Sequence, residues 1–424
     1  MLSTLRDAWK IPDLRKKMIF TILMLLVVRL GASIPVPFMD KEAIRQIFSS
    51  SQGGVLQFLD MMSGGTLSSY SVFAANIYPY ITASIILQLL TIAIPRLEEL
   101  AKEGEEGKKK INRYTRYGAI VLAAVQAIGL TFGLFRPALE TTNTMQNVIV
   151  ILSIVAGTAF LMWIGELITE KGIGNGISLL IFIGIISRLP RDLINTVKLV
   201  SIGQLSVISV LLFGIVMLII IAFVVALQEG ERRIPVQYAK RVVGRKMYGG
   251  QSTHIPIKVL MAGVIPVIFA SSLLALPQTV SLFSQGGVVQ WIEKYLTPAG
   301  PVGIWIYSIL NIILIIFFTY FYTAVQFNTV EYSKNLQQNG GFIPGIRPGR
   351  PTSDHLNKVV NRITFVGGMS LALLATLPVI LSKVFNMDIN FGGTAIIIVV
   401  GVALETVKQI ESQMLMRHYK GFLK

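Results

Sequence analysis

The side chains that could carry chemistry are nearly absent from the long apolar runs of this 424-residue sequence. Its three histidines, His254, His355 and His418, all fall in polar stretches outside those runs. No pair of aspartates lies within a run, and the chain has no cysteine. Metal sites built from histidine or cysteine, serine–histidine nucleophiles and intramembrane aspartate pairs are therefore excluded there. We expect no catalytic residue, no metal and no cofactor.

Nucleotide-binding motifs are missing as well. The sequence has no G-x-x-x-x-G-K-[ST] loop, whose backbone would hold nucleotide phosphates. The glycines between Gly172 and Gly176 lack the spacing of a dinucleotide fingerprint, and they follow an apolar run rather than a strand. We therefore expect that the chain is not an enzyme.

Isoleucines at helical spacing are the feature that the apolar runs do offer. Ile77 and Ile81 are four residues apart, and so are Ile177 and Ile181. This spacing places each pair on one face of a helix. Such pairs face lipid or the protein core in an ordinary membrane helix.

Ten apolar runs supply the elements that would position these residues. Two are short, Ile177–Leu189 and Thr394–Leu404, and are counted as spans because the alternation of charge fails without them. The other eight approach or exceed the length that crosses a bilayer. They are Met18–Ile34, Val72–Ile94, Tyr117–Phe135, Val148–Ile168, Val207–Leu227, Ile257–Leu276, Ile304–Phe327 and Val359–Val384.

Basic residues are sorted between alternate connections. Of the 38 lysines and arginines, 29 fall in the two tails and in every second loop. Short loops rich in lysine and arginine stay in the cytoplasm, so both termini are expected there. A net charge of +16 is compatible with nucleic-acid binding, but the sorting and attraction to anionic lipids explain it better. With 53% hydrophobic and 14% charged residues, an ordinary soluble enzyme is excluded.

The ten spans divide into two halves of five, residues 1–200 and 201–424. Because five is odd, the second half would insert upside down, as in inverted-topology repeats. The second span of each half contains a proline, Pro79 or Pro266, which we expect inside the helix. The fifth span of each half follows glycines, Gly172–Gly176 or Gly392–Gly393, which we expect to line a cavity.

The stretch from Gly53 to Ser71 is too short to span a bilayer and too apolar for a solvated loop. We expect a short helix that folds back into the bundle, and a helix lying on the membrane surface is the alternative. Its characteristic residues are Val55, Leu56, Phe58, Leu59, Met61, Met62, Ser63, Gly64 and Gly65.

Two long loops lie on the side predicted to be cytoplasmic. Residues 228–256 carry basic residues among β-branched and aromatic ones, which predicts a basic hairpin or extended arm. Residues 328–358 include the turn-rich stretch Gly340–Pro351, which we expect to be neither helix nor regular strand. Both loops suit docking of a partner. The alternative is a solvated connection, which explains their charge but not their length.

The chain resembles the SecY family, the channel-forming subunits of the bacterial Sec protein translocase. One departure is Phe38, where the family pattern has glycine, and it affects only a local turn. The resemblance covers nearly the whole length and is carried by Arg29–Gly31, Ile34–Pro37, Met62–Gly65, Pro79–Leu90, Tyr114–Gly118, Gly165–Glu166, Thr169–Gly176, Gln251–His254, Met261–Pro266 and Pro344–Gly349.

The resemblance implies an all-α polytopic fold of ten transmembrane helices, in two inverted halves that open around an hourglass pore. It implies an aliphatic ring at the constriction, formed by Ile77, Ile81, Ile177, Ile181, Ile268 and Ile398. The segment of about residues 53–68 would be a plug that closes the pore from outside. Spans two and three would face seven and eight as a lateral gate, near Gln88, Ser271 and Ser272.

The same resemblance implies a protein-conducting channel in the bacterial cytoplasmic (inner) membrane. SecE and SecG would be partner subunits, and the SecA ATPase or the ribosome would drive transport. Signal peptides and translocating polypeptides would be its substrates. Docking is expected at Arg347 first, and then at Arg232, Arg233, Lys240 and Arg241.

Two other functions remain open from the sequence. A small-solute secondary transporter with inverted repeats would need a polar or charged site near the midplane of the membrane. An insertase or scaffold would lack a plug and a closed ring.

Overall fold

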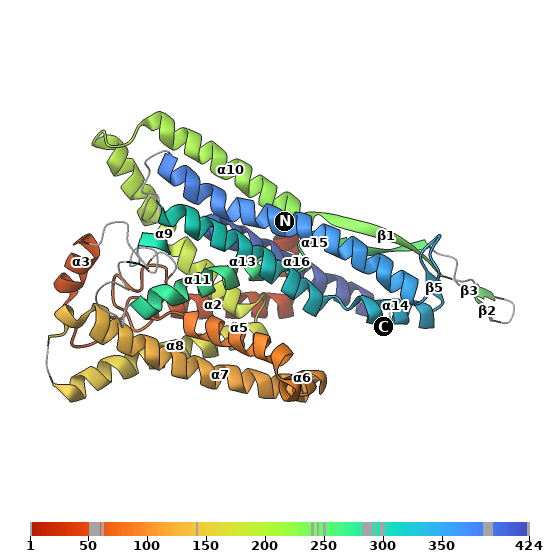
Figure 1. Ribbon diagram of the computed structural model, residues 1–424, viewed down its shortest axis with the longest axis horizontal. Helices are drawn as coiled ribbons and strands as arrows, with labels where there is room; N and C mark the ends of the chain where they lie inside the picture. Colours follow the sequence, from red (N-terminus) through yellow and green to blue (C-terminus); the bar gives the residue numbers. More distant parts are fainter. Residues whose placement is uncertain are drawn as a thin grey trace.

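The computed structural model describes residues 2–50, 60, 63–140, 143–238, 241–243, 246–248, 252–281, 291, 294–296, 302–384 and 393–421. Most of this chain is helical, and each of the ten predicted apolar runs contains a helix (Figure 1). These helices are α2 (Pro12–Gly31), α5 (Tyr78–Ala93), α7 (Glu105–Ile128), α8 (Thr144–Lys171), α9 (Gly176–Ser201), α10 (Val207–Glu229), α11 (Ile265–Ser281), α13 (Gly303–Gln326), α15 (Arg350–Val384) and α16 (Gly393–Gly421).

Several helices are able to span a membrane. Among the described residues, five stretches are long and apolar enough, or six if α5 and the next helix, α6 (Pro95–Lys102), form one span. These two helices are bent by 101° at Ile94, so they are two elements rather than one straight rod. The five are Glu105–Leu134, Thr144–Lys171, Val207–Glu229, Gly303–Gln338 and Arg350–Pro378. The chain is therefore a multi-pass membrane protein.

The two prolines of the second spans do not interrupt their helices, contrary to our expectation. Pro79 lies in the first turn of α5, and Pro266 is the second residue of α11. A proline is tolerated in the first turn because its missing N–H would have no helical partner there. The apolar run before Pro79, from Val72 to Ile77, is a series of turns instead of helix. The first six residues of span two are thus irregular, and Ile77 lies at the junction with α5.

The predicted cavity at Gly172–Gly176 is not present; these residues form a close-packed turn between α8 and α9. A Cβ at Gly176 would overlap the carbonyl oxygen of Gly165, so the two helices approach at backbone distance. Ile173 N donates to the hydroxyl of Thr21 in α2 at 3.0 Å, which ties the turn to a third helix. Glycine is required here by packing. In the second half, Gly393 begins α16, and Gly392 lies outside the described residues.

Several helix pairs join the two halves of the chain, among them α1 (Leu2–Lys10) with α16, and two further pairs carry the residues predicted for the ring. Helix α5 packs against α11, and α9 packs against α16. One buried apolar cluster crosses both contacts, with members from all four of these helices. The residues predicted for the ring lie on these same four helices.

The loop of residues 228–256 is an antiparallel hairpin, as predicted. Strand β1 (Glu231–Tyr238) pairs with β4 (Ser252–Lys258), and at the tip β2 (Arg241–Val243) pairs with β3 (Lys246–Tyr248). The hairpin extends beyond the helices at one end of the molecule, opposite to α3 (Lys41–Ser50) (Figure 1). The alternating pattern of β1 buries Ile234 and Val236 on one face.

The second long loop is more ordered than we expected. It contains α14 (Thr329–Gln338) and β5 (Gly341–Phe342), which pairs with the outer end of β1. Leu336, Ile343 and Leu356 complete a buried cluster beneath the hairpin. Since both loops were assigned to the same side by charge, their pairing agrees with that assignment.

The opposite loops also come together. The segment after α2 forms two isolated bridges. Pro35 pairs with Ser71, which follows the segment predicted to be the plug, and Met39 pairs with Leu139, which follows α7. Phe38 within this segment has φ +62°, a conformation that glycine adopts most easily. The expected glycine position is thus a left-handed turn, and Phe38 occupies it without changing the fold.

Candidate functional site

Five isoleucines from four helices line one small cavity between the two halves. Ile77 and Ile81 come from the start of α5, Ile181 from α9, Ile268 from α11 and Ile398 from α16. Each is at most 7% exposed. The cavity has a volume of about 260 Å³, of which the part open to water would hold only about one water molecule. Among the described residues, the side chains therefore close against one another at this level.

We call this cavity with its five isoleucines the neck. Asparagine side chains define where two of its helices begin. The Ile77 N–H donates to the Asn76 side chain at 2.8 Å, and α5 begins directly after it. At α9, the Asn175 side chain accepts from the N–H groups of Ile177 and Ser178, which caps the helix. The irregular segments before α5 and α9 therefore end at these hydrogen-bonded asparagines.

Ile177 does not line this cavity, although we predicted it as a ring member. It is partly buried and packs beside the same apolar cluster. Its side chain lies next to Gly165, where an added Cβ would be 3.4 Å from Ile177 Cγ1. Ile177 lies one helical turn closer than Ile181 to the turn between α8 and α9. At this position it packs against α8 and not into the cavity.

Three further residues line the cavity that the sequence did not assign to the ring. They are Asn76, Tyr78 and Ser272. Asn76 has φ +52°, a conformation in which asparagine is enriched among non-glycine residues. The sequence signal that could have identified Asn76 is an asparagine shortly before the proline in the first turn of a helix. Ser272 was predicted at the lateral gate, but its hydroxyl donates to Ile268 O in its own helix at 2.8 Å.

The cavity contains no charged lining residue among those described. Within the same part of the chain, no group of three or more histidine, cysteine, aspartate or glutamate residues could hold a metal. The neck therefore offers apolar side chains with a few neutral polar groups at its rim. Such a lining excludes ions through the cost of desolvation.

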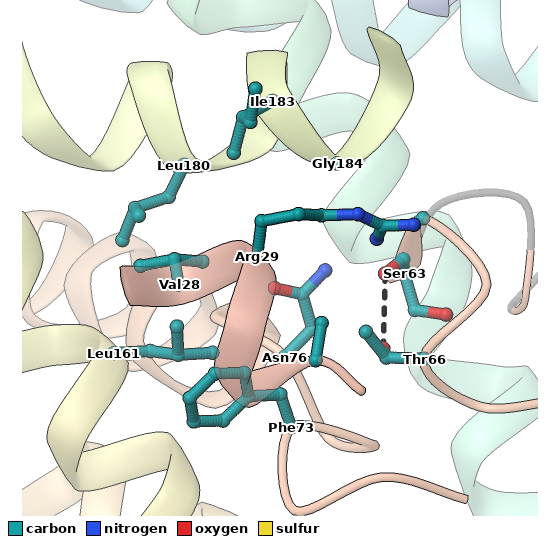
Figure 2. Close-up of a pocket in the computed structure, with 12 residues that line it drawn as sticks. Val28, Arg29, Ser63, Thr66, Phe73, Asn76, Leu161, Leu180, Ile183 and Gly184 are labelled. Atoms are coloured by element: carbon teal, nitrogen blue, oxygen red, sulfur yellow. Dashed lines mark hydrogen bonds between the residues drawn. The ribbon is translucent and has the colours of Figure 1, made fainter. Parts of the chain in front are cut away.

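A second pocket lies beside the neck, between α2, α8, α9 and the segment predicted to be the plug (Figure 2). It encloses about 380 Å³, and Asn76 borders both this pocket and the neck. Figure 2 shows that the Arg29 side chain, which is exposed, extends across the pocket toward Ser63.

The described part of the predicted plug consists of Asp60 and the residues from Ser63 onward. The Ser63 hydroxyl donates to Asp60 O at 3.0 Å, and Gly64 and Gly65 follow with φ +72° and +86°. A Cβ on Gly64 would lie 2.7 Å from Gly184 O, so this segment touches the backbone of α9. The remaining predicted plug residues, Val55, Leu56, Phe58, Leu59, Met61 and Met62, lie outside the described residues.

One polar contact joins α5 to α13 across the seam predicted to be the lateral gate. The Tyr322 hydroxyl donates to Gln88 Oε1, and Gln88 Nε2 donates to Ser84 Oγ at 3.2 Å. Ser271, like Ser272, bonds to its own helix, through Val267 O at 2.8 Å. Within the described part of the chain, Gln88 is the one of these three residues whose side chain bonds to another helix. Phe269 of α11 packs edge-on to Tyr322, with ring centroids 5.1 Å apart.

The predicted docking residues lie at the hairpin end of the molecule. Arg232 and Arg233 are exposed on β1, and Arg233 pairs with Glu231 at 2.6 Å. Arg347 is exposed in the turn between β5 and α15, and its carbonyl accepts from the Thr352 hydroxyl at 2.9 Å. This bond fixes the backbone and leaves the guanidinium outside. Arg241 begins β2, and Lys240 lies outside the described residues.

Comparison with known sequences gives a consistent result. The sequence profile of the SecY family matches residues 71–407. Protein translocase subunit SecY of Halalkalibacterium halodurans is 46% identical, over 100% of both chains. The corresponding subunit of Aquifex aeolicus is 43% identical, again over 100% of both chains.

Solved structures share the fold at lower sequence identity. A protein-conducting channel has a TM-score of 0.69 at 20% identity, covering 97% of each chain. Sec61 in the canine ribosome–channel complex from the endoplasmic reticulum has a TM-score of 0.66 at 19% identity, also covering 97% of each.

Proposed function

Because the chain belongs to the SecY family of protein translocase subunits, we propose that it conducts unfolded polypeptides across the bacterial cytoplasmic membrane. It is a channel subunit and not a catalyst. The observation that carries the proposal is the convergence of Ile77, Ile81, Ile181, Ile268 and Ile398 on one narrow cavity. The ten helices would cross the membrane as two inverted halves of five.

The isoleucine neck would seal the channel at rest and would close around a polypeptide during translocation. An apolar constriction is hydrated only at a cost, so ions do not cross it at rest. Aliphatic side chains also offer no fixed hydrogen-bonding partner, so a sliding polypeptide of any sequence is not held. A polar or charged solute site would do the opposite, and for this reason we favour a protein channel over a secondary transporter.

The seam between α5 and the pair α11–α13 would be the lateral gate. The bond from Tyr322 to Gln88 crosses this seam, and buried apolar residues of α5, α11 and α13 pack around it. A signal peptide or nascent membrane helix would enter lipid here, driven by transfer of its apolar surface. The Tyr322–Gln88 bond would bias the seam toward the closed form. Ser271 and Ser272 would line the gate without crossing it.

The hairpin and the Arg347 turn would receive the partners on the cytoplasmic side. Their basic side chains suit the acidic surface of the ribosome or of the SecA motor ATPase. The buried cluster beneath β1 holds the hairpin against α14 and α15, so force on the loops would reach the helices. SecE and SecG would be the membrane partners, and anionic lipids would bind the positively charged face.

Replacing Ile81 or Ile181 by asparagine should raise the resting ion conductance of the reconstituted channel by about tenfold or more, because a polar group favours water in the neck. Ile177→Asn is the matched control, since Ile177 lies on the same helix as Ile181 but outside the cavity. Conductance across planar bilayers measures the effect. If both ring variants kept background conductance, the assignment of the seal to these residues would be wrong.

Tyr322→Phe should ease opening of the lateral gate, because the hydrogen bond to Gln88 is lost. A net contribution of about 0.5–1.5 kcal/mol corresponds to a gate that opens roughly two- to tenfold more often. Export of a precursor with a shortened signal-peptide core should rise accordingly in reconstituted vesicles. Tyr320→Phe is the control, since the Tyr320 hydroxyl bonds to Asn361 O within the second half. Equal export by both variants would contradict the gate assignment.

Arg347→Glu should reduce motor-driven export by about tenfold or more, because charge reversal opposes docking of an acidic surface. The variant should still co-purify with SecE, since the Arg347 side chain is exposed. Lys198→Glu at the opposite end provides a charge-reversal control. Loss of SecE from the Arg347 variant would instead indicate a structural role for this residue.

A further inference from the structure

A buried ion pair connects the plug segment to α9. Arg188 Nη1 lies 3.3 Å from Asp60 Oδ2, and the two side chains are only 14% and 8% exposed. The other carboxylate oxygen, Asp60 Oδ1, accepts from the Ser68 backbone N–H at 2.7 Å. One carboxylate therefore closes the turn of the plug segment on itself and binds it to a neighbouring helix.

The same face of α9 carries both the neck and this contact. Ile181, Gly184 and Arg188 follow each other at intervals of three and four residues, so they lie on one stripe of the helix. Ile181 lines the neck, Gly184 touches Gly64, and Arg188 pairs with Asp60. The plug segment thus lies along α9 on the continuation of the surface that closes the neck.

The charges at this contact depend on each other. The contact of Arg188 Nη1 with Asp60 is ionic and lacks hydrogen-bond geometry, and Arg188 Nε and Nη1 are buried without a hydrogen-bond partner among the described residues. The nearby carboxylates must therefore compensate the charge. Asp192, one turn further along α9, also interacts electrostatically with Arg188, Arg191 and Asp60. A buried charge without compensation is costly, and the loss of one member of such a pair destabilises the arrangement that holds it.

We propose that the Arg188–Asp60 ion pair is an electrostatic latch that holds the plug segment against α9 and the neck in the resting channel. The inference rests on the proposed function and adds Arg188 to it as a positioning residue. The attraction is strong while the site is dry and becomes weak once water enters, because the effective dielectric constant rises. Opening that wets the pocket would therefore release the latch, and drying would restore it.

Neutral replacements test the charge of the ion pair while keeping the other contacts of these residues. Asp60→Asn retains a carbonyl oxygen that accepts from the Ser68 N–H, so it removes the charge alone. Arg188→Gln removes the charge from the other side, and Arg188→Lys retains it. Arg191→Gln is the matched control, because Arg191 is exposed three residues further along the same helix.

Resting ion conductance of the purified channel complex in planar bilayers is the readout. Asp60→Asn and Arg188→Gln should each raise it by about tenfold, and the double variant should be no leakier than either single one, as expected for one shared interaction. Arg188→Lys and Arg191→Gln should stay close to the unmodified channel. A purely structural role would not produce this pattern of charge rescue and non-additivity.

The proposal is overturned if both neutral variants seal as tightly as the unmodified channel, or if their leaks multiply in the double variant. Should Arg188→Gln fail to assemble, Asp60→Asn alone decides between a leak and a tight seal. A channel of unmodified sequence that exports no precursor under motor drive contradicts the proposed function itself. That result is distinct from a tight Asp60→Asn channel that exports normally, which removes only the latch.

Discussion

Apolar contact between the two halves at the isoleucine neck is the interaction on which the rest of the structure depends. The halves touch along α5 with α11 and along α9 with α16, and the neck lies where these contacts meet. In the proposed channel, small relative movements of the halves would therefore change the width of the neck directly. Because dispersion and hydrophobic contacts are not directional, the neck would close again around a translocating chain.

Polar contacts surround this neck and restrict how it opens. Asn76 lies beside it at the start of α5, Tyr322 and Gln88 join α5 to α13, and the ion pair of Asp60 and Arg188 joins the segment predicted to be the plug to α9. The two hydrogen bonds are directional and partly buried, and the ion pair is largely buried. Each therefore favours one arrangement and loses strength when water reaches it. The apolar neck would thus supply the seal, while these three contacts would set the free energy required to open it.

Many elements of the fold could be predicted from the sequence. Helical periodicity identifies single helices, and the sorting of basic residues indicates on which side of the membrane each loop lies. Helices in ten apolar runs, the hairpin of residues 228–256 and the shared cavity of Ile77, Ile81 and Ile181 all followed from patterns or resemblance. What failed depended on packing between elements. Periodicity could not show that Ile177 packs against Gly165, that the Gly172–Gly176 turn is filled, or that Arg188 meets Asp60, 128 positions earlier in the chain.

The most direct test of the central claim is photocrosslinking from position 81 to a polypeptide stalled during export. The account predicts efficient crosslinks from a photoreactive residue at position 81, and at positions 181 and 398, to the stalled chain. It predicts none from position 193, where the leucine side chain is 64% exposed on the far part of α9. Crosslinks from position 81 to lipid alone, with the stalled chain captured elsewhere, would contradict it.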